Sequence, residues 1–222
     1  MTGQVFIQNY DAVCVNVEEI FRYAGVRKAS SQDEALVKQC LLEAEGAFHY
    51  RVCYSVFPVQ ITGDEVDFGF AKTTSKDLAK SLEDCENAVV FCATIGLDID
   101  RLIAKYGVVS PSKALTFQAI GAERIESLCE LFCAEMRAKY IQLKPRFSPG
   151  YGDLNLAFQS SVFRALDCSK KIGVTLTDTL LMTPSKSVTA IMGISNKACE
   201  KEKSGCQSCE NKDCEFRREQ WK

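Results

Sequence analysis

"RVCYSVFPVQITGDEVDFGF", residues 51–70, alternates apolar and polar side chains and contains a Gly-Asp pair at positions 63 and 64. Alternation with a period of two predicts β-strands, and a Gly-Asp pair between two such runs predicts a hairpin. A short, partly β-branched apolar run, "NAVVFCATIG" (87–96), predicts a buried strand. Residues 174–195, "VTLTDTLLMTPSKSVTAIMGIS", predict two strands around a turn at positions 184–187.

Helical patterns lie between these strands. Ser31 and Glu34 have capping-box spacing at the start of one helix, Thr74 is a candidate cap for another, and Gly107 is a candidate stop for a third. A fourth has apolar residues at helical spacing from Ser112 to Tyr140. The expected helices are 16–25, 31–48, 74–85, 97–107, 112–140 and 155–173.

The order of these elements shows no regular βαβ alternation and no internal repeat. We therefore expect an α+β fold with a mostly antiparallel twisted sheet flanked by helices. Beyond Ser195 the composition becomes charged and cysteine-rich, which predicts a small C-terminal appendage. The expected domains are residues 1–195 and a tail of residues 196–222.

The composition is that of a globular protein, with 46% hydrophobic and 25% charged residues among 222. The formal net charge of −2 and the scattered basic residues argue against a nucleic-acid-binding surface. The N-terminal residues show no signal-peptide pattern, and no apolar run is long enough to span a bilayer. These features predict a cytoplasmic protein that does not enter the membrane.

The chain contains one histidine, His49, and no Gly-x-Ser-x-Gly segment. A Ser-His-Asp hydrolase of the α/β type is therefore not expected. His49 follows the end of a predicted helix, and we interpret it as a structural or surface residue.

The segment "RFSPGYGD", residues 146–153, combines an arginine, two glycines and an aromatic residue. Pro149-Gly150 suits the centre of a type II turn, because proline presets its own φ and glycine accepts the positive φ that follows. A tight turn is one interpretation of the segment. The other is a ligand cradle, in which Gly152 allows close approach to the backbone and the planar fork of Arg146 binds a carboxylate or phosphate.

Residues 146–195 resemble the activation domain of vitamin B12-dependent methionine synthase. The family carries an Arg-x-x-x-Gly-Tyr segment, an amphipathic helix, an "IG-x-x-LT" step and a "P-x-x-SV" turn into a strand. The matching residues here are Arg146, Gly150, Tyr151, Ile172-Gly173, Leu176-Thr177, Pro184 and Ser187-Val188. "CATIG" and the long helix after it are also similar, so the resemblance covers about residues 85–195; upstream it rests on "IFRYAG" alone.

The resemblance implies that the protein binds S-adenosylmethionine (AdoMet) and presents its methyl group to cobalamin. Arg146 would hold the methionyl carboxylate, and Tyr151 would lie near the reacting methyl. The implied AdoMet-binding residues are Arg146, Ser148, Pro149, Gly150, Tyr151 and Gly152. The chain departs from the longer enzymes in continuing with Gly152-Asp153-Leu154 instead of a Pro- and Cys-containing stretch.

Two features of the longer enzymes are missing. The Asp-x-His-x-x-Gly segment that binds cobalamin in methionine synthases is absent, and 222 residues are too few for the substrate barrels. The resemblance therefore implies a stand-alone activation subunit that acts on a separate cobalamin-binding methionine synthase or corrinoid protein. By itself the chain is not expected to make methionine.

Twelve cysteines fall into two groups. Eight are dispersed through apolar patterns and are expected to be buried thiols: Cys14, Cys40, Cys53, Cys85, Cys92, Cys129, Cys133 and Cys168. Cys199, Cys206, Cys209 and Cys214 lie close together in the tail. Four thiolates without histidine suit an iron–sulfur cluster or zinc. A single Cys-x-x-Cys pair favours the cluster over zinc, and four free thiols remain the alternative.

The leading hypothesis is an AdoMet-binding subunit that supports reductive remethylation of cobalamin. An alternative hypothesis is an iron–sulfur electron carrier that reduces a corrinoid protein without binding AdoMet. A third is a docking module that only covers cobalamin. AdoMet titration separates the first hypothesis from the other two.

Overall fold

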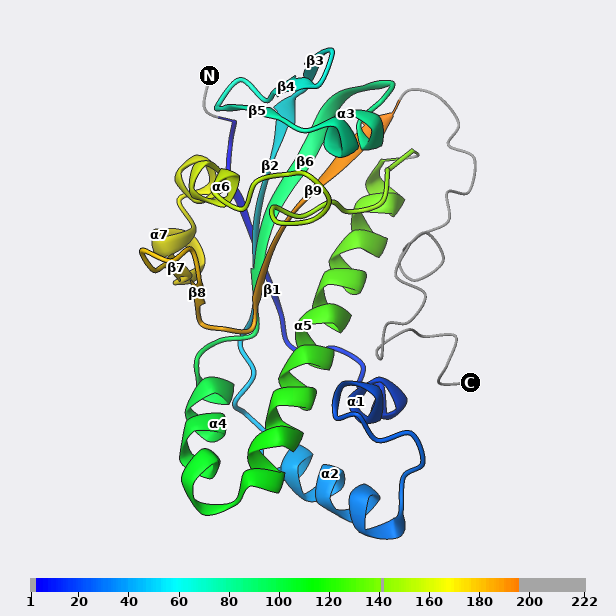
Figure 1. The fold of residues 1–222 in the computed structure, drawn as a ribbon, viewed down its shortest axis with the longest axis vertical. Coiled ribbons are helices and arrows are strands. Elements are labelled where there is room, and N and C mark those ends of the chain that lie inside the picture. Colours follow the sequence, from blue (N-terminus) through cyan, green and yellow to red (C-terminus); the bar gives the residue numbers. More distant parts are fainter. Residues whose placement is uncertain (1–2, 141, 196–222) are drawn as a thin grey trace.

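The computed structural model describes residues 3–140 and 142–195. Its centre is a four-stranded antiparallel sheet with the order β1-β2-β6-β9, as Figure 1 shows. The strands are β1 (Phe6–Tyr10), β2 (Tyr50–Pro58), β6 (Cys85–Thr94) and β9 (Ser187–Ser195). Strands from both ends of the described chain thus meet in one sheet, and the antiparallel pairing agrees with the predicted α+β class.

The larger hydrophobic core joins one face of this sheet to four helices, of which the longest packs on the sheet and the other three pack around it. They are α1 (Val17–Tyr23), α2 (Ser31–Glu43), α4 (Asp98–Val109) and α5 (Pro111–Lys139). In Figure 1, α1, α2 and α4 gather around one end of the long helix α5. The buried stripe of α5 follows the predicted helical spacing, and Phe117, Leu128 and Phe132 on it are fully buried.

The opposite face of the sheet has its own hydrophobic core. Three short helices and two small sheets, one of three strands and one of two, cover this face. They are β3 (Gln60–Thr62), β4 (Glu65–Asp67), β5 (Lys72–Thr74), α3 (Lys76–Ser81), α6 (Phe158–Leu166), α7 (Cys168–Ile172), β7 (Thr175–Leu176) and β8 (Met182–Thr183). The turn at Gly63-Asp64 joins β3 to β4, as the sequence predicted.

Strand β6 is central in the sheet, which explains why its sequence is apolar from Ala88 to Ala93. Val89 and Phe91 belong to the core with α5, whereas Val90 and Cys92 belong to the core on the other face. Because successive side chains of a strand point to opposite faces, a strand covered on both sides has no exposed position to fill with polar residues. The predicted buried strand at 87–96 is confirmed.

Several predicted boundaries need correction. The capping box of α2 is formed by Ser30 and Asp33, one residue before the predicted pair Ser31 and Glu34. The cap of α3 is Ser75 instead of Thr74, because the Ser75 hydroxyl accepts from the Leu78 N–H.

Helix α4 passes through Gly107 and ends at Val109, so Gly107 is not its stop. The next residue, Ser110, precedes Pro111 and is extended, with φ −158° and ψ 85°. A residue before proline is disfavoured in helical geometry, which explains the later end. The single helix predicted at 155–173 is two helices, because Asp167 between them has a left-handed φ of 51°.

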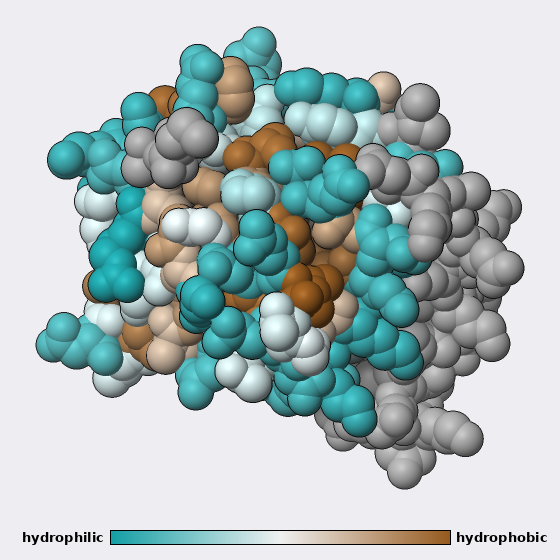
Figure 2. All heavy atoms as spheres, turned by 90° about the horizontal axis from the view of Figure 1, so that it is seen from above, coloured by the Kyte–Doolittle hydropathy of each residue, from teal (hydrophilic) through white to brown (hydrophobic). Residues whose placement is uncertain are grey.

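Among the described residues, no helix is long and apolar enough to cross a membrane. The view from above in Figure 2 shows hydrophobic side chains near the centre of the face, interspersed with hydrophilic ones. The predicted tail, residues 196–222, lies outside the described residues.

Candidate functional site

The turn predicted at Pro149-Gly150 is present. The Ser148 carbonyl accepts a hydrogen bond from the Tyr151 N–H at 3.0 Å, and Gly150 has a φ of +86°. A type II turn requires this positive φ at its third residue, and glycine adopts it without steric cost. The interpretation as a tight turn is therefore confirmed for residues 148–151, and it leaves Arg146 and Gly152 to be explained.

The segment is held on both sides. Before the turn, Phe147 exchanges two backbone hydrogen bonds with Ile191 of β9, each 2.8 Å long. After the turn, the Asp153 carboxylate accepts from the Ser75 hydroxyl and from the N–H groups of Lys76 (2.8 Å) and Asp77 (3.2 Å) at the start of α3. The loop is therefore fixed between the edge of the main sheet and α3.

Arg146 lies between the edge of the sheet and α5. Its Nη2 is 2.5 Å from a Glu126 carboxylate oxygen and 3.4 Å from one of Glu130. Burial opposes the charge of the guanidinium, but Glu126 outweighs it, so the pKa of Arg146 is raised. With 24% of its side chain exposed, Arg146 is a permanent cation at the surface of a partly desolvated acidic cluster.

Glu126 and Glu130 also line a groove of about 760 Å³. One wall is the chain segment 12–19 together with Tyr23, and the other is the part of α5 between Glu123 and Leu131. This volume lies within the roughly 300–1,000 Å³ typical of small-molecule sites. Arg146 adjoins the groove through its two glutamate partners.

The groove is acidic. Glu18, Glu19, Glu123, Glu126 and Glu130 all line it. Glu19 is paired with Arg22, and Glu123 is paired with the buried Arg124. Glu126 and Glu130 share Arg146. Five carboxylates thus line the groove beside three arginines, which leaves an excess of negative charge. Such an arrangement suits a ligand with positive groups and one carboxylate.

The predicted ligand-binding residues are only partly brought together. Arg146 contacts residues of the groove, whereas Ser148, Pro149, Gly150, Tyr151 and Gly152 lie in the adjoining loop and are not among its lining residues. Tyr151 is 56% exposed, and its ring meets that of Phe147 edge-on at 5.4 Å.

The presence of glycine at position 152 has a structural explanation that does not involve a ligand. Its φ is +55°, and a Cβ at this position would lie 2.5 Å from a carboxylate oxygen of Asp77. Asp77 in turn accepts from the Asp153 N–H at 3.3 Å. A larger residue at this position would be strained and would displace the Asp77 carboxylate from the connection between the loop and α3.

The sequence interpretation missed the acidic wall of the groove. Glu123, Glu126 and Glu130 follow one another at spacings of three and four residues, which places them on one side of α5. That spacing was visible in the sequence. The opposite wall, residues 12–19, carries no local motif and becomes part of the site only through folding.

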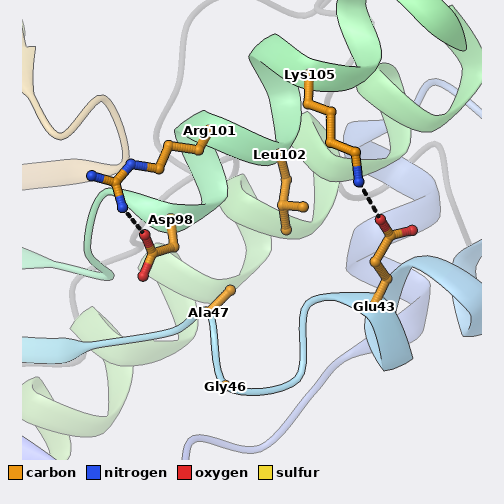
Figure 3. Close-up of a pocket in the computed structure, with 7 residues that line it drawn as sticks. All are labelled: Glu43, Gly46, Ala47, Asp98, Arg101, Leu102 and Lys105. Carbon is orange, nitrogen blue, oxygen red and sulfur yellow. Dashed lines mark hydrogen bonds and ion pairs between the residues drawn. The ribbon is translucent and has the colours of Figure 1, made fainter.

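A second, smaller pocket of about 380 Å³ lies between α2 and α4 (Figure 3). Its cations already have carboxylate partners, since Arg101 pairs with Asp98 and Lys105 with Glu43. His49 borders this region, 49% exposed, with its Nε2 3.1 Å from Asp98. His49 is thus a surface residue, as predicted, and the charges of this pocket satisfy one another.

Comparisons with known proteins add the following. No protein-family model matches the sequence, and a search of curated proteins returns no match. Among solved structures, the chain is similar to the "Crystal Structure of the MetH Reactivation Domain bound to AdoHcy", with a TM-score of 0.62 and 16% identity. The alignment covers 89% of this chain and 80% of that one.

The protein has the fold of a MetH reactivation domain. The predicted resemblance to the methionine synthase activation domain is therefore confirmed at the level of the fold. The solved domain binds AdoHcy, the product that remains when AdoMet has given up its methyl group.

The eight cysteines of the described residues are free, and seven of them are buried as predicted. The prediction is wrong for Cys14, which is exposed on the groove wall. Within residues 3–140 and 142–195 no group of three or more His, Cys, Asp or Glu side chains could hold a metal ion. The predicted ligands Cys199, Cys206, Cys209 and Cys214 lie outside the described residues, so the metal site stays a prediction.

Replacing Asp153 with Asn is expected to lower the melting temperature at pH 7. The Ser75 hydroxyl and the N–H groups of Lys76 and Asp77 stabilise the charged form and lower the pKa of Asp153. Because the folded pKa is below the unfolded value of about 3.9, this contribution is fully present above pH 4 and is lost as the pH falls through the folded pKa.

Thermal melts of wild type and Asp153→Asn between pH 7 and pH 2 test this expectation. The difference in melting temperature is expected to shrink with acidification, while the exposed control Asp178→Asn shows little difference at any pH. A difference that is independent of pH would show that the charge of Asp153 does not stabilise the loop.

Proposed function

We propose that the protein binds AdoMet in the acidic groove and its adjoining loop. The observation that carries this proposal is the position of Arg146, a partly buried arginine paired with Glu126 and Glu130, which line the groove. The shared fold with an AdoHcy-binding domain supports it.

The charges of AdoMet match this arrangement. AdoMet carries a carboxylate at one end, an ammonium group on the same carbon and a sulfonium centre near its middle. Both ion pairs of Arg146 with α5 use Nη2, and the guanidinium has further N–H donors on Nη1 and Nε for a ligand carboxylate. The ammonium and sulfonium cations would then face the groove carboxylates, which favour positive charge.

The function of the bound AdoMet is methyl donation to cobalamin held by a separate protein. The reaction balances as cob(II)alamin plus one electron plus AdoMet giving methylcobalamin and AdoHcy: the cobalt gains the electron and forms the new carbon bond, and the sulfonium bond breaks. The electron must come from a low-potential donor such as a flavoprotein or an iron–sulfur protein. The partner is a cobalamin-binding methionine synthase or corrinoid protein that lacks its own activation domain.

A reconstitution tests this function. The full chain, AdoMet and a chemical reductant are mixed with such a cobalamin protein in the cob(II)alamin state, and the absorption spectrum is followed. Methylcobalamin is expected to form only when all components are present. Formation at the same rate without this protein would contradict the proposal, and reduction without any need for AdoMet would favour the electron carrier.

We further propose that the tail cysteines bind one metal centre, because four thiols share one short polar segment. The double substitution Cys206→Ser, Cys209→Ser removes two of four ligands and is expected to abolish most of the bound iron or zinc. Metal analysis of anaerobically purified protein measures this, with Cys40→Ser, Cys168→Ser as the matched control of two cysteines outside the tail. Equal metal content in the wild type and the tail variant would rule the site out.

A further inference from the structure

A buried ion pair lies under the wall of the groove. Glu123 and Arg124, neighbours on α5, are each 1% exposed, and the Arg124 Nε is 2.5 Å from a Glu123 carboxylate oxygen. Charged residues are rarely buried this completely unless they are paired and hydrogen-bonded. The groups that hydrogen-bond to Glu123 and Arg124 therefore explain how this pair can be buried.

Besides the Ser127 hydroxyl, which donates to a Glu123 carboxylate oxygen at 2.6 Å, the partners are backbone groups of the segment before α1. Arg124 donates from Nη1 to the Val13 carbonyl at 2.7 Å and from Nη2 to the Cys14 carbonyl at 2.5 Å. Glu123 accepts from the Asn16 N–H at 3.0 Å. One charged pair thus binds three backbone groups within four consecutive residues.

These residues form one wall of the acidic groove. Residues 12–19 line it, and α1 begins directly after them with Asn16 as its cap. The segment has no strand or helix of its own before Val17, so local secondary structure does not hold it. Its position relative to α5, and with it the width of the groove, depends on contacts to other elements.

We propose that Arg124 and Glu123 are positioning residues for the ligand: they fix residues 13–16 against α5 and so preform the groove. This inference rests on the proposed binding of AdoMet. Their side chains bond the backbone of the wall, and Arg124 itself is not among the lining residues. A wall ordered in advance removes a conformational cost that ligand binding would otherwise have to meet.

The hydrogen bonds to the backbone explain why charged residues occupy positions 123 and 124 better than a contribution to the stability of the fold does. Well-packed hydrophobic side chains of similar size often replace a buried ion pair without loss of stability. Hydrophobic side chains could not donate to two carbonyls or accept from an N–H. The directional bonds therefore specify where the segment lies, which packing alone does not.

Two variants test the proposal. Arg124→Met keeps an unbranched side chain of similar length but loses both bonds to carbonyls, and Glu123→Gln keeps the shape while removing the charge. Val162→Ala, which truncates a fully buried residue in the core on the other face of the sheet, is the control for a general loss of stability. Each full-length protein is compared by calorimetric titration with AdoMet and by hydrogen exchange of residues 12–19.

The expected result is faster exchange of the Asn16 amide and AdoMet binding weakened by about tenfold or more in both variants. Val162→Ala is expected to keep the wild-type affinity although it unfolds at lower temperature. AdoMet affinity within twofold of wild type in folded Arg124→Met and Glu123→Gln would overturn the proposal, as would unchanged exchange at Asn16.

The experiment also separates this inference from the proposed function. If the wild type binds no AdoMet, the proposed function fails and the ligand part of the inference fails with it. If the wild type binds AdoMet and the two variants bind it equally well, the proposed function stands and the positioning role alone is refuted.

Discussion

Replacing Arg146 with alanine is expected to weaken AdoMet binding by about ten- to a hundredfold. A charge-assisted hydrogen bond to a carboxylate contributes about 1.5–3 kcal/mol, and each 1.4 kcal/mol is a factor of ten in the dissociation constant. The loss is expected to be at the larger end of this range, because the site is partly desolvated and Glu126 and Glu130 would then face the ligand carboxylate without an intervening cation.

Arg146→Lys is expected to recover only part of the affinity. An ammonium group keeps the charge but lacks the planar fork that can bind a carboxylate and the α5 glutamates together. Calorimetric titration measures both variants, with Arg164→Ala, a surface arginine of α6, as the matched control.

Arg146 also contributes to the stability of the fold. Its pairing with Glu126 and Glu130 means that the alanine variant also loses some stability, about 1 kcal/mol or less for pairs that retain this much exposure. Affinity and melting temperature must therefore be measured on the same protein. A lower melting temperature combined with unchanged AdoMet affinity would assign Arg146 to structure alone and refute its role in binding.

Replacing Phe132 with alanine is expected to have the largest effect on folding. Phe132 is fully buried on α5, and its ring centre lies 4.8 Å from that of Phe91 on β6 and 5.2 Å from that of Tyr54 on β2. It therefore joins the long helix to the centre of the sheet. Truncating a buried phenylalanine costs about 3–5 kcal/mol through lost transfer energy and the cavity that remains.

A loss of this size is comparable with the whole stability of many domains, which is about 5–15 kcal/mol. Chemical denaturation measures it, and Leu115→Ala, on the same helix but 55% exposed, is the control expected to change stability by less than about 0.5 kcal/mol. A cost below about 1 kcal/mol for Phe132→Ala would contradict the packing of α5 on the sheet.

The sequence predicted most elements of the fold because their signals are local. The stripe on α5, the apolar run of β6 and the turn at Gly63-Asp64 are all set by residues near one another in the chain. Apart from the break at Asp167, the errors lie at helix ends where two local signals compete. Ser30 and Ser31 could both cap α2, and only the structure shows that Ser30 bonds the Asp33 N–H.

The site was predictable only in part. The turn at Pro149-Gly150 follows from residue types, and the structure confirms it. The acidic groove could not be predicted as a whole, because it joins residues 12–19 to Glu123, Glu126 and Glu130, more than a hundred positions away. The buried pair Glu123–Arg124 that connects them looks in the sequence like any charged pair on a helix.

The central claim is that AdoMet binds in the acidic groove with its carboxylate on Arg146. A crystal structure of the full chain grown with AdoMet tests it most directly. The account predicts one AdoMet per chain, with its carboxylate within hydrogen-bonding distance of Arg146 and its ammonium and sulfonium groups facing Glu126 and Glu130. AdoMet bound elsewhere on the molecule, or bound in the groove with its carboxylate away from Arg146, would contradict it.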